Sequence, residues 1–177
     1  MSEGNDSGSV ARLIGNGFLT DKRAQEIQSM FPQVSDSLVQ WIRDSAATRD
    51  WRRVERFANL AAAVRAPGLG SVLCEILAAD PYGLNKEDLV EILGEVGAVD
   101  CAPVIIQLVK DSLASDAPAY WLCQKAILAL ADLGTEESRR FLSSMTADSW
   151  PNPIRWHAAV ALNVEDELGF DEDEMPA

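Results

Sequence analysis

The chain has 177 residues, of which 47% are hydrophobic and 24% are charged, a composition typical of a folded globular protein. Its 15 basic and 28 acidic residues give a net charge of -13 at pH 7. This charge argues against general binding to nucleic acid or anionic membranes, because both depend on Lys and Arg near phosphates. No apolar run approaches the roughly 20 residues of a membrane span, and the start MSEGNDSGSV lacks secretory-signal features. We therefore expect a cytoplasmic protein.

Helical periodicity dominates the sequence, without sustained period-two alternation, and predicts an all-α fold. Residues 1–10 are rich in Ser, Gly and Asn and predict a disordered N-terminus, and residues 11–47 predict an irregular helical cap. Residues 48–167 predict a repeat domain, and the acidic residues 168–177 predict a disordered tail. The apolar stripes are Trp51, Val54, Phe57, Ala58 and Ala61; Leu89, Ile92, Leu93 and Val96; Cys101, Val104, Ile105, Leu108 and Val109; Leu122, Ala126, Ala129, Leu130 and Leu133; Phe141, Leu142 and Met145; and Ile154, Ala158, Ala161 and Leu162.

Two residue types mark expected helix ends. Asn85 precedes Lys86 and two acidic residues, which predicts an N-cap. Gly134 follows the fourth stripe, where a glycine takes the left-handed conformation that ends a helix.

An internal repeat is the most informative feature of the sequence. Segments related by 32 or 37 residues match one another: 91–97 with 128–134, 124–130 with 156–162, and 64–77 with 96–109. A period of this length in antiparallel helix pairs predicts an α-solenoid, in which each pair buries its apolar face by stacking on its neighbours.

Two segments carry a family resemblance. LVEILGEVGAVDCAPVIIQLVKD has a helix, a Gly break and a second helix entered near a Pro, and PIRWHAAVAL has an aliphatic–Arg pair before an Ala-rich face. Over about residues 50–166 the chain resembles the HEAT-like repeat family, in the short variety associated with phycobilisome lyases. The resemblance implies a short right-handed α-solenoid of antiparallel HEAT-like helix pairs with an irregular helical N-terminal cap. We expect the last pair to be incomplete, since Pro153–Asp166 provides one helix before the acidic tail.

The sequence offers little for catalysis. His157 is the only histidine, which excludes a His-cluster metal site and the His-Glu pairs of HEAT-like deoxyhypusine hydroxylases. Cys74, Cys101 and Cys123 form an odd set without CxxC spacing, which predicts reduced, buried thiols. We therefore expect no enzyme activity, no catalytic residue, no metal and no cofactor.

Exposed charged and aromatic residues are the candidates for protein binding. An acidic face along one helix is predicted by the spacing of Glu87, Glu91 and Glu95; it is either a solvated surface or a docking ridge for a basic protein. The second helices of the repeats, expected on the concave surface, supply polar residues of both signs. The candidate partner-binding residues are Glu75, Glu87, Asp88, Glu91, Glu95, Gln107, Lys110, Arg139, Arg140 and Trp156.

These features favour a non-enzymatic protein-binding module. Its acidity and small size predict an immunity or antitoxin-type inhibitor that neutralises a cognate protein, such as a basic toxin or nuclease. Two alternatives stay open, a general scaffold or assembly chaperone and a bilin-lyase-like cofactor-handling protein. A third, nucleic-acid binding, rests on the basic spacing of Arg49, Arg52, Arg53 and Arg56, as in HEAT-like DNA glycosylases. The strongly negative net charge disfavours that third reading.

Overall fold

The structure, a computed structural model, describes residues 3–15 and 19–170. Within these ranges it contains ten α-helices, one short 3-10 helix and no strand, which confirms the all-α class. No helix in the described ranges combines the length and the apolar character needed to cross a lipid bilayer. The chain divides into two compact units, residues 1–92 (unit 1) and 93–177 (unit 2), and each is described by itself.

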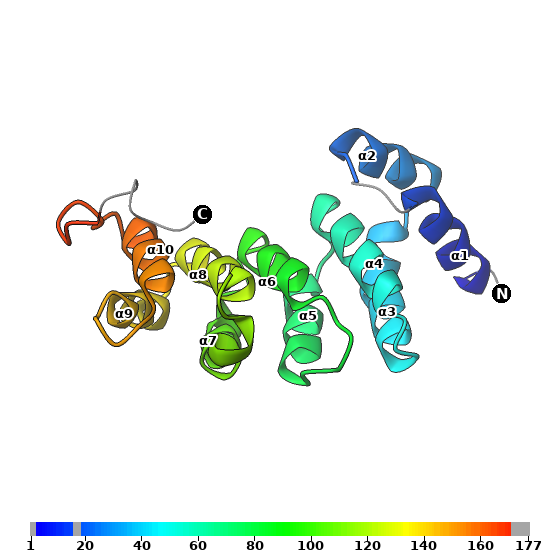
Figure 1. Ribbon diagram of the computed structural model, residues 1–177. Coiled ribbons are helices and arrows are strands. Elements are labelled where there is room, and N and C mark those ends of the chain that lie inside the picture. The colour runs from blue at the N-terminus through cyan, green and yellow to red at the C-terminus, as the bar shows by residue number, and fades with distance from the viewer. Residues whose placement is uncertain (1–2, 16–18, 171–177) are drawn as a thin grey trace. The chain divides into compact units, whose positions relative to one another are not determined.

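Unit 1 is built from five helices and most of a sixth (Figure 1). Helix α3 packs against α4, and α4 in turn contacts α1, α2 and α5. The helices are α1 (Glu3–Ile14), α2 (Asp21–Met30), α3 (Val34–Ala47), α4 (Trp51–Ala63), α5 (Leu69–Ala78) and α6 (Lys86–Glu95), the last of which crosses the unit boundary.

The predicted disorder of residues 1–10 is wrong for the part that the structure describes. Helix α1 begins at Glu3, and its later turns bury Val10, Ala11 and Ile14. Because α1 packs on α2 and α4, tertiary burial of these three side chains outweighs the poor helix propensity of the Ser- and Gly-rich start.

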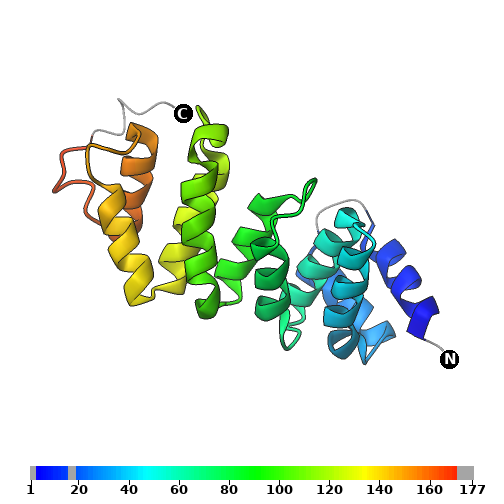
Figure 2. The same cartoon turned by 90° about the horizontal axis from the view of Figure 1, so that it is seen from below.

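Unit 2 shows the packing expected of stacked helix pairs. Consecutive helices contact each other, and in addition α8 contacts α10 while α7 contacts α9. The first helices of successive pairs, α8 and α10, thus pack on each other, and so do the second helices, α7 and α9. Figures 1 and 2 show both pairings side by side. The elements are η1 (Val99–Cys101), α7 (Ala102–Asp116), α8 (Trp121–Leu133), α9 (Glu136–Met145) and α10 (Asn152–Leu162).

The apolar stripes predicted from the sequence supply much of the core. Phe57, Leu93, Ile105, Leu130 and Leu142, one from each of five stripes, are each at most 1% exposed. Val96 was predicted to be buried but is 36% exposed, because α6 ends one residue before it. Six other stripe members are half-buried: Trp51, Val104, Leu122, Phe141, Ala161 and Leu162.

Both predicted helix ends are confirmed. The Asn85 side-chain Oδ1 accepts a hydrogen bond from the Asp88 backbone N–H at 3.5 Å, at the start of α6. Gly134 follows α8 with φ +58°, a conformation that glycine adopts without the steric penalty of a Cβ.

After α10 the described chain contains no further helix. Residues 163–170 form turns that return over α10, where the guanidinium of Arg155 lies 5.3 Å from the ring centre of Phe170. This agrees with the expected incomplete last pair. Most of the predicted tail, residues 171–177, lies outside the described residues, and the domain boundaries at 10, 47 and 167 stay predictions.

Candidate protein-binding surfaces

Helix α6 carries the predicted acidic residues. Glu91 and Glu95 are exposed, whereas Glu87 and Asp88, in the first turn, are half-buried. Glu55 of α4 lies near Asp88 in unit 1. Burial raises the pKa of the Glu55 carboxyl, and the Asp88 charge raises it further. The negative charge that the surroundings disfavour is therefore that of Glu55, which lies near the first turn of α6.

Glu75, predicted to bind a partner, is already engaged within unit 1. Two nitrogens of the Arg43 guanidinium donate to its carboxylate oxygens at 2.5 and 3.3 Å. The hydrogen bond and charge of Arg43 lower the pKa of Glu75, and the same contact raises the pKa of Arg43. Its charge is thus balanced by a residue 32 positions earlier.

The predicted residues on α7 make contacts inside unit 2. The side-chain amide of Gln107 donates to Asp111 at 2.8 Å, one turn along the same helix. The ammonium of Lys110 lies 5.4 Å from the ring centre of Phe141 on α9, close enough for a cation–π contact. Lys110 therefore contributes to the packing of α7 against α9.

The remaining predicted residues lie on α9 and α10. Arg139 is exposed, and Arg140 pairs with Glu136 on its own helix at 3.8 Å. Trp156 is half-buried, with its ring centre 4.8 Å from that of His157. Its indole Nε1 is buried and has no hydrogen-bond partner in the described part of the chain. Of the ten predicted residues, four lie in unit 1 and six lie in unit 2, and their role in partner binding stays a prediction.

Exposed apolar side chains on α8 and α10 are the feature that the predicted residue set missed. Trp121 is 64% exposed, Leu128 is 52% exposed, and Val160 on α10 is 37% exposed. Trp121 and Leu128 are seven residues apart and therefore share one helix face. The repeat match of 124–130 with 156–162 places Leu128 and Val160 at equivalent positions, and α8 packs against α10. This repeat match is the signal that could have found them.

Described residues of unit 1 line two pockets that differ in size. The larger has a volume of about 500 Å³ and the smaller about 320 Å³. Asp6, Met30, Phe31, Pro32, Gln33, Val34, Ser37 and Trp41 line the larger pocket. Arg43, Ala46, Trp51, Val72, Glu75, Ile76, Ala79 and Pro81 line the smaller pocket, which contains the Arg43–Glu75 ion pair.

The cysteines differ from the three reduced thiols that the sequence predicts. Cys74 and Cys101 are each disulfide-bonded, so the prediction of reduced thiols is wrong for both; residue spacing alone does not reveal a disulfide. Cys123 is free and buried. Burial, with a smaller effect of Asp116, raises its pKa to about 12. Since the thiolate is the reactive form, Cys123 is a poor nucleophile at neutral pH.

His157 is half-buried on α10. Burial lowers the pKa of His157, so the imidazole is neutral at pH 7. No group of three or more His, Cys, Asp or Glu side chains in the described ranges is arranged to hold a metal ion.

Comparison with known families identifies the fold. A sequence model of HEAT repeats matches residues 70–163, more than half of the chain. The chain belongs to the HEAT repeat family. Neither curated proteins nor solved structures gave a significant match. The HEAT repeats run from the first turn of α5 to the end of α10, a narrower range than the predicted 50–166. HEAT repeats are helix pairs of α-solenoids and serve as protein-interaction modules.

Proposed function

We propose that this chain is a non-enzymatic protein-binding module for a basic partner, and that it acts as a stoichiometric inhibitor of the immunity or antitoxin type. The observation that carries the proposal is the group of exposed apolar side chains on α8 and α10, Trp121, Leu128 and Val160. We call this group the α8/α10 apolar surface.

The α8/α10 apolar surface has the composition of an interface centre. Trp is enriched among the residues that dominate binding energy, and such residues act where flanking side chains exclude water around them. Leu128 and Val160, at equivalent repeat positions, extend apolar area from one helix to the next. A partner that covers them removes this area from water, which supplies the main favourable term of association.

Charge specifies the kind of partner. Residues 93–177 hold fifteen acidic and five basic residues, a net charge of -10, whereas residues 1–92 carry only -3. The α8/α10 apolar surface therefore belongs to the more acidic unit. Complementary charge accelerates encounter with a basic protein and selects against acidic ones.

The thiols disfavour the cofactor-handling alternative. A protein that attaches or transfers a chromophore through a cysteine needs an accessible thiol with a lowered pKa. Here Cys74 and Cys101 are disulfide-bonded, and Cys123 is buried with a pKa of about 12.

Affinity capture with a matched pair of variants tests the binding surface. Trp121→Ala combined with Leu128→Ser removes the centre of the α8/α10 apolar surface. Val99→Ser is the control, because Val99 is 49% exposed on η1 and outside this surface. Wild type and control should retain one stoichiometric partner through washes at about 0.15 and 0.5 M salt, since the higher salt screens non-specific charge attraction. The double variant should bind at least about 30-fold more weakly, the effect of losing one hot-spot residue worth about 2 kcal/mol.

The partner's own activity then distinguishes an inhibitor from a scaffold. Under the proposal, one equivalent of this chain abolishes that activity, and the double variant does not. A stable complex in which the partner remains fully active contradicts the inhibitor function and favours a scaffold or assembly chaperone. Equal capture by the double variant and the control rules out the α8/α10 apolar surface as the binding site.

A further inference from the structure

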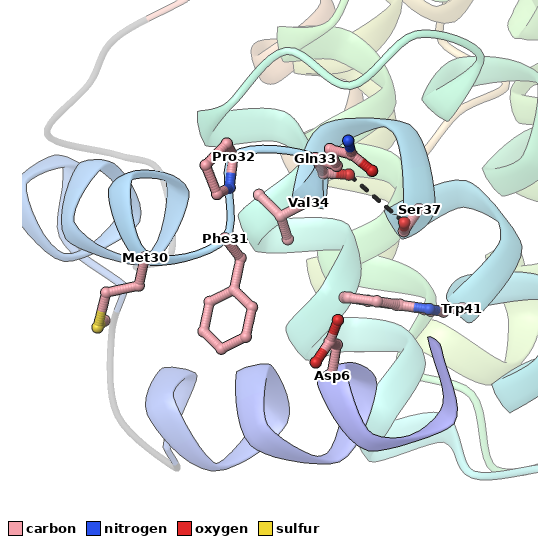
Figure 3. Close-up of a pocket in the computed structure, with 8 residues that line it drawn as sticks. All are labelled: Asp6, Met30, Phe31, Pro32, Gln33, Val34, Ser37 and Trp41. Atoms are coloured by element: carbon pink, nitrogen blue, oxygen red, sulfur yellow. Dashed lines mark hydrogen bonds between the residues drawn. The ribbon is translucent and has the colours of Figure 1, made fainter. Parts of the chain in front are cut away.

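We infer that the larger pocket of unit 1 binds an arginine side chain presented by an extended basic peptide segment. Figure 3 shows its setting: Asp6 comes from α1, Phe31 from the turn after α2, and Trp41 from α3, and all three line the same space. The inference goes beyond the proposed function, because this pocket lies in unit 1 and is tested without the α8/α10 apolar surface.

Charge is the first argument for a cationic ligand. Among the eight lining residues that the structure describes, Asp6 is the one charged side chain, and none of the eight is Lys, Arg or His. Asp6 forms no salt bridge with another described residue. The Arg53 guanidinium contacts Ser7 at 3.5 Å and lies 5.7 Å from the ring centre of Phe57, but Arg53 is not among the described lining residues. A guanidinium entering this space can therefore pair with the Asp6 carboxylate.

Aromatic rings are the second argument. Trp41 and Phe31 both border the pocket, and the faces of such rings attract cations, most strongly for Trp. Trp41 is held in place because it packs against Phe57 of α4, with ring centres 5.4 Å apart. The ring is therefore preorganised, and a ligand does not have to order it.

Size and polarity decide the occupant. A volume of about 500 Å³ exceeds that of one side chain, so the pocket accommodates an arginine together with neighbouring backbone. Gln33, also in the lining, supplies a side-chain amide for that backbone, and the Ser37 hydroxyl, which donates to the Gln33 carbonyl at 3.4 Å, can still accept a hydrogen bond. Arginine suits the pocket better than lysine, because the planar guanidinium stacks on an aromatic ring and still donates to a carboxylate.

A titration with two matched peptides tests this inference. The full chain, labelled with ¹⁵N, is titrated at about 50 mM salt, where electrostatic attraction is weakly screened. The probes are acetyl-Gly-Gly-Arg-Gly-Gly-amide and the same peptide with citrulline, which keeps the shape of arginine without its charge. We expect saturable shifts of the Trp41 indole resonance with the arginine peptide. The citrulline peptide should bind at least about tenfold more weakly, a loss of about 1.4 kcal/mol.

Three variants locate the site. Asp6→Asn should bind the arginine peptide as weakly as wild type binds the citrulline peptide, and Phe31→Leu should weaken binding several-fold. Asp21→Asn is the matched control, because Asp21 is a first-turn acid of α2 that does not line the pocket, and it should bind as wild type. Unchanged resonances of unit 1 residues outside the pocket, such as those of α5, verify that each variant is folded.

Several outcomes overturn the inference. These are equal binding of the two peptides, full binding by a folded Asp6→Asn variant, saturable shifts confined to residues outside the pocket, and no saturable shift in the wild type. None of these results bears on the α8/α10 apolar surface, so the two proposals fail independently.

Discussion

Gly94 of α6 faces α8 without room for a side chain. A Cβ placed on Gly94 would lie 2.9 Å from the Ala129 Cα and 3.1 Å from its Cβ, and neither atom belongs to a flexible side chain that could move aside. Gly→Ala in a helix normally stabilises by about 0.5–1 kcal/mol. Here we expect Gly94→Ala to lower the free energy of unfolding by about 1–3 kcal/mol through overpacking, as measured by urea denaturation.

Gly8 of α1 provides the control for this substitution. A Cβ on Gly8 meets only the Arg53 guanidinium, at 3.9 Å, which is an ordinary contact. Gly8→Ala should therefore leave stability unchanged or raise it slightly. A Gly94→Ala variant as stable as wild type would contradict the close approach of α6 and α8.

Glu55 makes stability depend on pH in a predictable direction. Burial and the Asp88 charge raise its pKa above the unfolded value, although the Asn85 backbone, Arg52 and Arg56 partly oppose the shift. Ionising Glu55 is therefore less favourable in the folded state, so stability falls as pH rises through its titration range. Glu55→Gln should be more stable than wild type at pH 7, with the difference disappearing near pH 4.

The expected gain is small, about 0.5 kcal/mol or less after solvent screening, because the Glu55 carboxyl is only half-buried. Urea denaturation at both pH values measures it. Glu167→Gln is the control, because it removes one negative charge from an exposed turn. It should change the free energy of unfolding only slightly, and by the same amount at both pH values. A Glu55→Gln variant less stable than wild type at pH 7 would show that the ionised carboxylate is needed for its contacts.

At the scale of the element, Asp116 caps the helix that follows its own. It lies at the end of α7, and its carboxylate accepts the Leu122 N–H at 3.3 Å and the Cys123 N–H at 2.8 Å in the first turn of α8. Asp116→Ala leaves both donors unsatisfied and removes a negative charge from the positive end of the helix dipole. We expect a loss of about 1–2 kcal/mol, measured by thermal and urea denaturation.

Asp111→Ala is the matched control, because Asp111 is an exposed acid of the same helix whose side chain accepts a hydrogen bond from Gln107 one turn earlier. Its effect should stay within about 0.5 kcal/mol. A second readout separates capping from general damage: Asp116 contributes to the raised pKa of Cys123, so Asp116→Ala should also make that thiol react faster with a disulfide reagent. Equal stability of the two variants would contradict the cap.

Local sequence signals predict the helices, whereas contacts between elements escape them. The spacing of Ala126, Leu130 and Leu133 predicts the buried face of α8, because one helix turn fixes it. The cap that Asp116 provides depends on the turn before α8, and the space at Gly94 depends on how closely two helices approach. Neither distance is encoded in residue spacing.

The candidate binding residues also fall into those that residue spacing predicts and those that depend on contacts between helices. Sequence places Glu87 and Glu91 on one helix, yet it gives no sign that Arg43 neutralises Glu75 from 32 residues away. Trp121 and Leu128 lie outside the buried stripe of α8, and Leu128 has an equivalent in Val160. Repeat comparison could therefore predict the α8/α10 apolar surface, whereas the pocket around Asp6 requires three separate helices to be placed.

For the whole molecule, the excess of negative charge should govern the response to salt. The chain carries -13 charges, and its acidic groups repel one another more in the compact folded state than in the expanded unfolded chain. The ion pairs that salt would weaken, such as Arg23–Glu26 and Arg140–Glu136, lie on the surface, and each contributes little to stability.

Raising sodium chloride from about 0.01 to 0.5 M shortens the screening length from roughly 30 Å to below 5 Å. The thermal midpoint should therefore rise, by about 2–4 °C for each kcal/mol of repulsion removed. Scanning calorimetry measures the midpoint, and a fall with added salt would show that the exposed ion pairs outweigh the repulsion.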